Sequence, residues 1–272
     1  MRAEPLGQDV ERLAGDGVTI AIPNWNHELF LPRSIGSALR AVEGLRRHAI
    51  AAEVLVIDDA SRDGSPTLLR QLEALYYNDG LRVLALRDNV GVAGARNVAL
   101  RLATRRYIAF LDADNELVET NLYHFYRSIR QTEATAVYGN VLSLSEGGAE
   151  VSVLSNESFQ ARIFRGNYID TCALYDRQHL IDCGGFEANP ESPMVEDWEL
   201  WQHLAASGRR IVEVPLAFAM YHNLPHSRVK EFTADMDRGR EKSTRIFNQS
   251  GVREKVRLNA KHLRYHPDIG WL

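Results

Sequence analysis

The chain has 272 residues, 45% of them hydrophobic and 25% charged, which is typical of a folded globular protein and excludes a largely disordered one. Its net charge of −4, with basic residues dispersed along the chain, gives no general attraction to nucleic acid, so no nucleic-acid partner is expected. No apolar run is long enough to span a bilayer and the N-terminal residues lack the apolar core of a secretory signal, so we expect a cytoplasmic protein without a transmembrane segment.

Strands and helices alternate through the first part of the chain. Residues 1–16 are polar and rich in Gly and Pro, which predicts a flexible leader before a domain that begins at residue 17. Apolar runs predict strands at Val18–Pro23, Glu53–Asp58, Leu81–Leu86 and Tyr107–Asp112. Helical spacing of apolar residues follows each of the first three strands, beginning near Leu31, Ser65 and Val92. This alternation predicts an α/β fold with a mostly parallel sheet and helices on both faces.

The pattern is less regular after Glu116. The predicted elements are a helix at Val118–Arg130, strands at Thr135–Leu144 and Val151–Leu154, a helix at Val195–Ala206, and strand-like segments at 211–215 and 218–222. A charged, proline-free segment, Arg228–Gln249, predicts a last helix outside the core. We therefore expect one domain over residues 17–227, with halves at 17–116 and 117–227, and a helical extension over residues 228–272.

Polar residues collect where the four predicted strands end. The segments are PNWN at 23–26, DDAS at 58–61, RDNVGVAGARN at 87–97 and DADN at 112–115. Ligands of parallel sheets bind beyond the carboxyl ends of the strands, so these segments should face one crevice. A purely structural sheet needs turn residues at its strand ends, but it does not need two acidic pairs at the same edge.

Asp112 and Asp114 follow a buried apolar strand and are spaced two residues apart. Side chains at i and i+2 of a strand point the same way, so both carboxylates could meet at one divalent cation, which prefers oxygen ligands. Such a cation could neutralise a diphosphate leaving group. The alternative is an exit turn, because Asp and Asn are also common in turns and at helix caps.

Six segments occur in an order that resembles one enzyme family. They are VTIAIPNWN, EVLVIDDASRDGS, DNVGVAGARNVAL, YIAFLDADN, CGGFEANPESPMVEDWELWQHLAASG and YHNLPHS. Their order, from Val18 to Ser227, is similar to that of the family-2 glycosyltransferases. The resemblance implies a GT-A fold, which has a Rossmann-like, mostly parallel central sheet and a smaller acceptor-side region, and it implies an enzyme that uses a nucleotide sugar.

The resemblance places the nucleotide at the first strand ends. It implies that Pro23 and Asn26 belong to the nucleotide pocket and that Asp58 and Asp59 contact the base, commonly uracil, with Asp59 the stronger candidate. A carboxylate can accept a hydrogen bond from a pyrimidine imide N–H. The structural alternative for Asp59 is a turn residue that closes the second strand. Gly91 would let the backbone approach the nucleotide closely.

The donor sugar and its diphosphate are implied at the third and fourth strand ends. Arg96 would supply a fixed cation, and the alternative is an ordinary helix start with a surface arginine. By resemblance, Asp112 and its neighbour Ala113 lie near the ribose and the donor sugar, and Asp114 binds the metal, Mn²⁺ or Mg²⁺. The family often continues this motif with another acidic residue, where this chain has Asn115.

The acceptor side is implied by the GGF and EDW motifs. A sugar hydroxyl is a poor nucleophile at neutral pH, so a general base must take its proton. Asp197 aligns with the family's base and Glu196 is the second candidate, while the structural alternative for both is charge complementarity with a helix N-terminus. The resemblance also implies acceptor contacts by Gly184, Gly185, Phe186 and Trp198. Trp198 or Trp201 could stack on a sugar ring, and the alternative for both is packing in the core, which is the more usual place of an aromatic residue.

Two late histidines are candidate metal ligands. GT-A enzymes often return a C-terminal histidine to the metal and diphosphate, and His222 and His226 lie in the corresponding part of this chain. The match is imperfect, because Leu224 stands where the family has its histidine. A structural or solvated histidine is the alternative at both positions.

The resemblance implies transfer of a sugar from a nucleoside-diphosphate sugar, commonly UDP-linked, to a hydroxyl acceptor with inversion. The Gln-x-x-Arg-Trp signature of processive polymerases is missing, which favours one addition per encounter. A sugar nucleotidyltransferase is disfavoured because PNWN is not a Gly-rich phosphate loop, and a dinucleotide oxidoreductase because no GxGxxG follows the first strand. A nucleotide-sugar-binding module without turnover is the remaining alternative.

Several properties stay open in the sequence. The acceptor can be a glycan, a lipid-linked sugar or a small molecule, and peripheral membrane contact and a homo-oligomer are both compatible with the composition. Two cysteines, Cys172 and Cys183, are too few for a disulfide framework or a four-ligand zinc site, so we expect free thiols.

Overall fold

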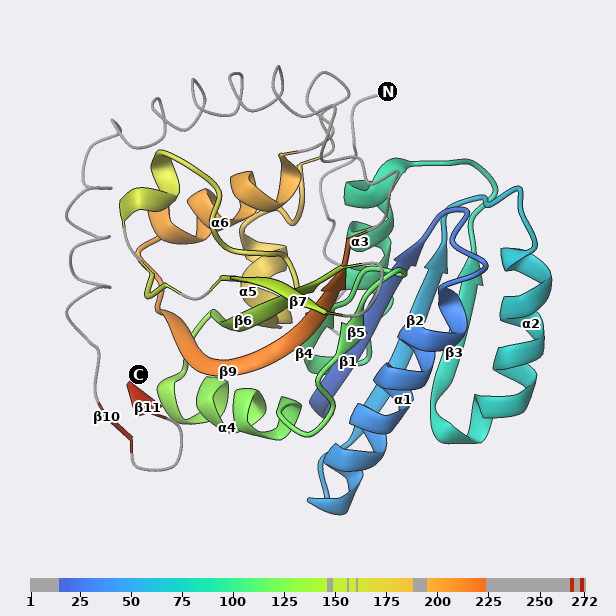
Figure 1. Cartoon of the computed structure of the whole chain (residues 1–272), viewed down its shortest axis with the longest axis horizontal. Coiled ribbons are helices and arrows are strands. Elements are labelled where there is room, and N and C mark those ends of the chain that lie inside the picture. The colour runs from blue at the N-terminus through green and yellow to red at the C-terminus, as the bar shows by residue number, and fades with distance from the viewer. Residues whose placement is uncertain are drawn as a thin grey trace.

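The computed structural model describes residues 15–145, 149–155, 157–159, 161–187 and 195–223, and the backbone of 265–266 and 270–271. Its centre is a nine-stranded sheet in the order β3-β2-β1-β4-β8-β6-β9-β5, with β7 paired to β6 (Figure 1). This architecture is the α/β fold that the sequence predicted. We call residues 15–115 the first half and residues 116–223 the second half.

The first half is a run of parallel βα units. Its elements are β1 (Gly15–Asn24), α1 (Leu31–Arg47), β2 (Ala52–Asp58), α2 (Ser65–Tyr76), the 3-10 turn η2 (Tyr77–Asp79), β3 (Leu81–Ala85), α3 (Gly91–Leu102) and β4 (Arg105–Phe110). Parallel ladders join β1 to β2, β2 to β3 and β1 to β4, so the carboxyl ends of these strands lie at one edge. The predicted order and types are confirmed, although β1 begins inside the predicted leader, of which residues 1–14 lie outside the described residues.

The second half has mixed strand directions. Its elements are β5 (Glu116–Leu117), α4 (Leu122–Thr132), β6 (Ala136–Leu144), β7 (Glu150–Leu154), the 3-10 turn η3 (Ala161–Phe164), β8 (Leu174–Asp176), α5 (Arg177–Asp182), α6 (Glu196–Ala206) and β9 (Ile211–His222). The short β8 lies antiparallel between β4 and β6, whereas β6 and β9 run parallel. Parallel pairing therefore dominates the first half, and antiparallel pairs join the second half to it.

Two parts of the second half differ from expectation. The segments predicted at 211–215 and 218–222 form one strand, β9, and register shifts opposite Gly139 to Val141 of β6 absorb its irregularity. The elements β5, η3, β8 and α5 were not predicted, because runs of two to six residues are too short to show a periodicity.

The end of the chain is described only in part. The predicted helix at Arg228–Gln249 lies outside the described residues. The extension does contain two short strands, β10 (Tyr265–His266) and β11 (Gly270–Trp271), which pair antiparallel with each other.

Helices lie on both faces of the sheet (Figure 1), and apolar side chains form one core on each face. Alternate residues of β1 point to opposite faces, so Ile20 and Ile22 join one core while Ala21 joins the other. Helices α1, α2 and α4 cover the first core, and α3, α5 and α6 cover the second. Because both faces are covered, all seven residues of β2 are buried.

Helix α1 illustrates how local sequence fixes an element at the strand edge. Its buried stripe includes Leu31, Ile35, Val42 and Leu45, the spacing that predicted the helix. Proline lies in its first turn, where the backbone N–H that proline lacks would have no partner within the helix. Two arginines lie in its last turn, where their positive charge interacts favourably with the helix dipole. The β1–α1 loop is consequently held at the carboxyl edge of the sheet.

Both cysteines are free thiols, as predicted, with Cys172 buried and Cys183 half-buried. In the described part of the chain, no helix combines the length and apolar character that a membrane crossing needs.

Candidate active site

Asp58 and Asp59 occupy the end of β2 but differ in their partners. Asp58 is 1% exposed, and its Oδ1 accepts hydrogen bonds from Asn24 Nδ2 at 2.7 Å and Ser61 Oγ at 2.6 Å. These bonds join the ends of β1 and β2. The Asp58 carboxylate is buried and bonded within the fold, and its base contact stays a prediction.

Asp59 links β2 to the start of α3. Its Oδ1 accepts the Val90 N–H at 2.7 Å, and its backbone oxygen accepts Asn89 Nδ2 at 3.0 Å. Burial raises the pKa of Asp59, backbone N–H donors at Val90 and Gly91 oppose this rise, and the charge of Asp58 adds to it. Gly91 has φ of +75°, which glycine adopts without strain. The base contact of Asp59 stays a prediction.

The β1–α1 loop presents polar and aromatic groups at the same edge. Asn26 is exposed, has φ of 59°, and accepts the Arg62 N–H on its Oδ1 at 2.7 Å, so it ties this loop to the one after β2. Pro23 is half-buried at the end of β1. Trp25, which the sequence analysis did not single out, is 40% exposed. An aromatic residue directly after a buried strand was the signal that could have identified it.

The two aspartates of DADN lie in a turn. Strand β4 ends at Phe110, and the Asn115 N–H donates to the Asp112 carbonyl at 3.0 Å. The inference that strand geometry aims both carboxylates the same way is therefore wrong, because the strand ends before them. Burial raises the pKa of Asp114, and the nearby charge of Asp112 raises it further. Ala113 between them is 2% exposed and packs its methyl group in the core.

Arg96 joins this turn to helix α6. It is 4% exposed; its Nη2 donates to Asp112 Oδ1 at 2.9 Å and its Nη1 to Glu196 Oε1 at 2.8 Å. Burial alone would lower the pKa of Arg96, but Asp112 and Glu196 raise it, so the guanidinium stays charged. The alternative of a surface arginine is wrong. Glu196 is a partner of Arg96, which makes it a weaker candidate for the base.

The GGF segment positions Arg96. The side-chain amide of Asn97 donates to the Phe186 carbonyl at 2.7 Å and accepts the Phe186 N–H at 2.8 Å. The Phe186 ring lies 5.3 Å from the Arg96 guanidinium carbon and packs edge-on against Phe110. Gly185 has φ of +72°, and a Cβ there would overlap Asn97 Oδ1.

The residues predicted to contact the acceptor fall into two groups, buried and exposed. Phe186 is 2% exposed and Trp198 is fully buried, with its Nε1 donating to the Ile163 carbonyl. Sugar stacking by Trp198 and acceptor contact by the Phe186 ring are wrong, because both rings are enclosed by the second core. Gly185 is also buried, whereas Gly184 is exposed, so its acceptor contact stays a prediction.

Asp197 is half-buried at the start of α6, next to Glu196. Its Oδ2 accepts Asn167 Nδ2 at 2.9 Å. The pKa of Asp197 is raised to about 7, chiefly by burial and also by the charges of Glu196 and Asp170, while Arg96 and the Trp198 N–H oppose the rise. A carboxylate with this pKa can both hold and release a proton near neutrality.

Asp170 belongs to the same group of charges but was not predicted from the sequence. Its pKa is raised to about 6, chiefly by burial and also by the charges of Asp112 and Asp114, while the Cys172 N–H and Arg96 oppose the rise. Its Oδ1 accepts the Cys172 N–H at 2.7 Å. An isolated acid in an irregular segment gave no motif that could reveal it.

His222 lies beside the DADN turn without joining its aspartates. Its Nε2 is 2.8 Å from Glu116 Oε1, and its N–H donates to Asn115 Oδ1 at 3.1 Å. Among the described residues, no group of three His, Cys, Asp or Glu side chains is arranged to hold a metal ion. His226 lies outside the described residues. The metal ligands stay a prediction.

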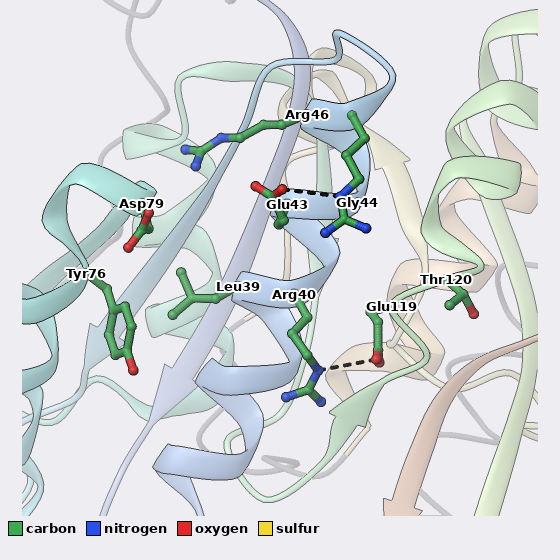
Figure 2. A pocket seen from close by; sticks show the side chains of 10 residues that line it. Leu39, Arg40, Glu43, Gly44, Arg46, Tyr76, Asp79, Glu119 and Thr120 are labelled. Carbon is green, nitrogen blue, oxygen red and sulfur yellow. Dashed lines mark hydrogen bonds and ion pairs between the residues drawn. The ribbon is translucent and has the colours of Figure 1, made fainter.

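A hollow of about 580 Å³ lies elsewhere, on the outer side of α1. Figure 2 shows Arg40 directed at Glu119, 3.2 Å away, with Tyr76 of α2 on the opposite wall. None of the predicted site residues lines it. The chemistry at the strand ends is therefore separate from this hollow.

The sequence pattern of Glycosyl transferase family 2 matches residues 19–187, which is more than half of the chain. The chain belongs to this family. The matched range contains the DADN turn, Arg96 and the GGF segment, and ends before α6. The protein is therefore a glycosyltransferase, as the sequence predicted.

Named relatives agree with this assignment. The chain is 24% identical over 214 residues to the UDP-Glc:alpha-D-GlcNAc-diphosphoundecaprenol beta-1,3-glucosyltransferase WfaP of Escherichia coli, covering 77% of each chain. Two other curated relatives are matched over 36% and 55% of their own length.

Solved structures confirm the GT-A fold. S. aureus TarS in complex with UDP-GlcNAc superposes with a TM-score of 0.69 at 18% identity, covering 90% of this chain and 71% of that one. The mannosyltransferase PcManGT from Pyrobaculum calidifontis, in complex with GDP-Man and Mn²⁺, gives 0.62 at 15% identity, covering 90% and 74%.

Proposed function

We propose that this glycosyltransferase moves a sugar from a UDP-sugar to a hydroxyl of a sugar acceptor, with inversion and one addition per encounter. The observation that carries the proposal is the Asp112–Arg96–Glu196 bridge. It holds the DADN turn, where the family binds its donor, against the first residues of α6. Asp197, the next residue of α6, then lies on the acceptor side of the same network.

The donor would lie along the carboxyl ends of β1, β2 and β4. Trp25 offers an exposed aromatic face on which a base can stack, and Asp59 lies at the neighbouring strand end. The Asp59 N–H donates to the Asn24 carbonyl at 2.8 Å, so the two segments are in register. UDP is favoured because WfaP is named for UDP-Glc and TarS was solved with UDP-GlcNAc.

Asp197 would supply the acid–base chemistry. The acceptor oxygen attacks the anomeric carbon, its proton passes to the Asp197 carboxylate, and the bond from the anomeric carbon to the diphosphate oxygen breaks. A base with pKa near 7 is ionised in a large share of molecules at neutral pH and still binds the proton firmly enough to accept it. A single displacement of this kind inverts the anomeric configuration.

A divalent cation fits the DADN turn. Asp112 and Asp114 are like charges close enough for one to raise the pKa of the other, and a cation between them would reverse that effect. Mn²⁺ or Mg²⁺ held there would offset the negative charge of the departing diphosphate. PcManGT, one of the similar structures, contains Mn²⁺.

The acceptor class we propose is a lipid-linked sugar. WfaP is named for an acceptor of this kind, alpha-D-GlcNAc-diphosphoundecaprenol. Five carboxylates interact electrostatically with one another or with Arg96, and Arg96 is paired with two of them. They are those of Asp112, Asp114, Asp170, Glu196 and Asp197. This surplus of negative charge favours a neutral sugar hydroxyl at the point of attack over an acidic group.

The test is a donor screen followed by a transfer assay. UDP-glucose, UDP-GlcNAc and GDP-mannose are each added with MnCl₂ or with EDTA, and the melting temperature is measured. We expect a UDP-sugar to stabilise the protein only with MnCl₂. UDP release is then measured with and without alpha-D-GlcNAc-diphosphoundecaprenol in detergent, and NMR of the product gives its anomeric configuration.

The outcomes separate the alternatives. Stabilisation by a UDP-sugar without UDP release under any acceptor condition would favour a binding module without turnover. Equal stabilisation with EDTA would contradict metal dependence. A product that keeps the donor's anomeric configuration would contradict the single displacement.

A further inference from the structure

Asn167 contacts Asp197 from a segment that no sequence motif indicated. The residue lies between η3 and β8, and its Nδ2 donates to Asp197 Oδ2 at 2.9 Å. The Ile169 N–H donates to Asn167 Oδ1 at 3.4 Å. Because a backbone N–H can only donate, this contact assigns the amide oxygen to Ile169 and the amide NH₂ to the carboxylate.

The segment that carries Asn167 is fixed on its C-terminal side. The Asp170 N–H donates to Ser155 Oγ at 2.7 Å, and the Cys172 N–H donates to Asp170 Oδ1 at 2.7 Å. Ile169, which lies between Asn167 and Asp170 in the chain, is 1% exposed and belongs to the second core. Asn167 therefore approaches Asp197 from a packed and hydrogen-bonded support.

The groups around Asp197 act on its protonation in opposite directions. Glu196 and Asp170 disfavour a further negative charge, while Arg96 and the Trp198 N–H, 2.6 Å from Oδ1, favour it. A donor at 2.9 Å on Oδ2 also favours the ionised form. The two oxygens of Asp197 are thus each held by one N–H donor, which fixes the plane of the carboxylate.

We propose that Asn167 is a positioning residue for the general base, whose amide fixes the Asp197 carboxylate and favours the form that accepts the acceptor's proton. This inference rests on the proposed function, in which Asp197 is that base. Asn167 itself touches neither substrate in the proposed reaction. Its effect is transmitted through the bond to Asp197 Oδ2.

A purely structural role for Asn167 makes a different prediction. If the bond only holds the segment in place, its loss lowers activity by the same factor at every pH. If the bond favours ionised Asp197, its loss moves the acidic limb of the kcat/KM profile to higher pH. A shift of the acidic limb to higher pH therefore distinguishes the positioning role from the purely structural one.

The experiment compares two substitutions at Asn167 with one matched control. Asn167→Ala removes the donor, and Asn167→Asp replaces it with a like charge of nearly the same shape. The control is Asn121→Ala, because Asn121 Nδ2 makes a bond of the same kind, 2.8 Å to the Ala217 carbonyl, far from Asp197 in the chain. UDP release from UDP-glucose to alpha-D-GlcNAc-diphosphoundecaprenol is measured from pH 5 to pH 9 in each variant.

We expect the acidic limb of the kcat/KM profile to move to higher pH by about one unit in Asn167→Ala. The loss of a hydrogen bond to a charged carboxylate should raise the pKa of Asp197 by about this amount. Asn167→Asp should move it further in the same direction. Asn121→Ala should leave its position unchanged. A limb that stays in place in both Asn167 variants, or that moves equally in the control, overturns the inference.

A stability measurement makes the result independent of turnover. The loss of melting temperature in Asn167→Ala should be larger at pH 8, where Asp197 is ionised, than at pH 5, and this pH dependence should vanish when Asp197→Asn is also present. A loss that is equal at both pH values overturns the inference. Failure of the proposed function would be seen separately, as transfer activity that survives in the single Asp197→Asn variant.

Discussion

The two halves of the molecule hold their functional groups in different ways. In the first half, Asp59 and the DADN turn follow directly from parallel strands, so the sheet itself brings them to one edge. In the second half, Asp197 stands at a helix start, and side-chain bonds from Arg96, Asn97 and Asn167 hold that region in place. The donor side thus depends on strand topology, whereas the acceptor side depends on a few buried polar contacts.

The largest expected effect separates the functions of the two halves. Asp197→Asn should lower transfer by about 10²- to 10⁴-fold, because it removes the proposed general base, while UDP-sugar binding with MnCl₂ is retained. Asp114→Ala in the first half should instead abolish metal-dependent binding. Melting temperature with UDP-glucose and MnCl₂, together with UDP release, measures both. Equal activity in the two variants would contradict the mechanism.

Removing the bridge between the halves should cost the most stability. Arg96→Met leaves Asp112 and Glu196 without their buried partner, so the free energy of unfolding should fall by about 3–5 kcal/mol. Urea denaturation measures the change. The control is Arg47→Ala, which breaks an exposed pair with Glu43 and should change stability by less than about 0.5 kcal/mol. Similar losses in both variants would show that the bridge does not join the halves.

Substitutions at two neighbouring glycines test the Asn97–Phe186 contact. Gly184 and Gly185 both have positive φ, so alanine strains the backbone at either position by about 1–2 kcal/mol. A Cβ at Gly185 also overlaps Asn97 Oδ1, whereas one at Gly184 meets nothing within 4 Å. Urea denaturation should therefore show a larger loss of stability for Gly185→Ala than for Gly184→Ala. Equal losses would mean that the loop moves away from Asn97 at little cost.

The smallest effect concerns pH and two acids of the second half whose pKa is raised, Asp197 and Asp170. Burial raises the pKa of Asp197 to about 7 and that of Asp170 to about 6, from about 3.9 in an unfolded chain. A raised pKa contributes stability below the unfolded value and loses it as pH rises through the folded value. Asp197→Asn and Asp170→Asn should therefore gain melting temperature relative to the parent as pH rises from 4.

The two variants should differ in where this gain ends. The gain should level off near pH 6 for Asp170→Asn and near pH 7 for Asp197→Asn, and Asn121→Ala should show no such trend. Differential scanning calorimetry between pH 4 and pH 8 measures the curves. A gain that falls with rising pH in either variant would contradict the raised pKa.

The sequence predicted the first half well because its signals are local. Apolar runs and helical spacing gave β1 to β4 and the intervening helices, and parallel strands necessarily bring their ends together. The exception was the DADN turn, because β4 ends at Phe110, paired with Ala21 of β1, and the apolar run alone did not show that the strand ends before Asp112.

The second half was harder to predict because its contacts are distant in sequence. Trp198 and Phe186 look like acceptor contacts in a motif, but their burial depends on packing against η3 and β4. Asn167 and Asp170 are single polar residues in an irregular segment, and only the folded chain brings them to Asp197. Family resemblance predicted Asp197 as the base, which stays a prediction, and it gave no information about which side chain bonds to this carboxylate.

Helix α3 contacts both sides of the proposed site. It begins beside Asp59, and it carries both Arg96 and Asn97 on consecutive residues. In the proposed reaction this single helix therefore contacts the donor side through Asp59 and Asp112 and the acceptor side through Glu196 and Phe186. A substitution that shifts α3 is expected to weaken the binding of both substrates together.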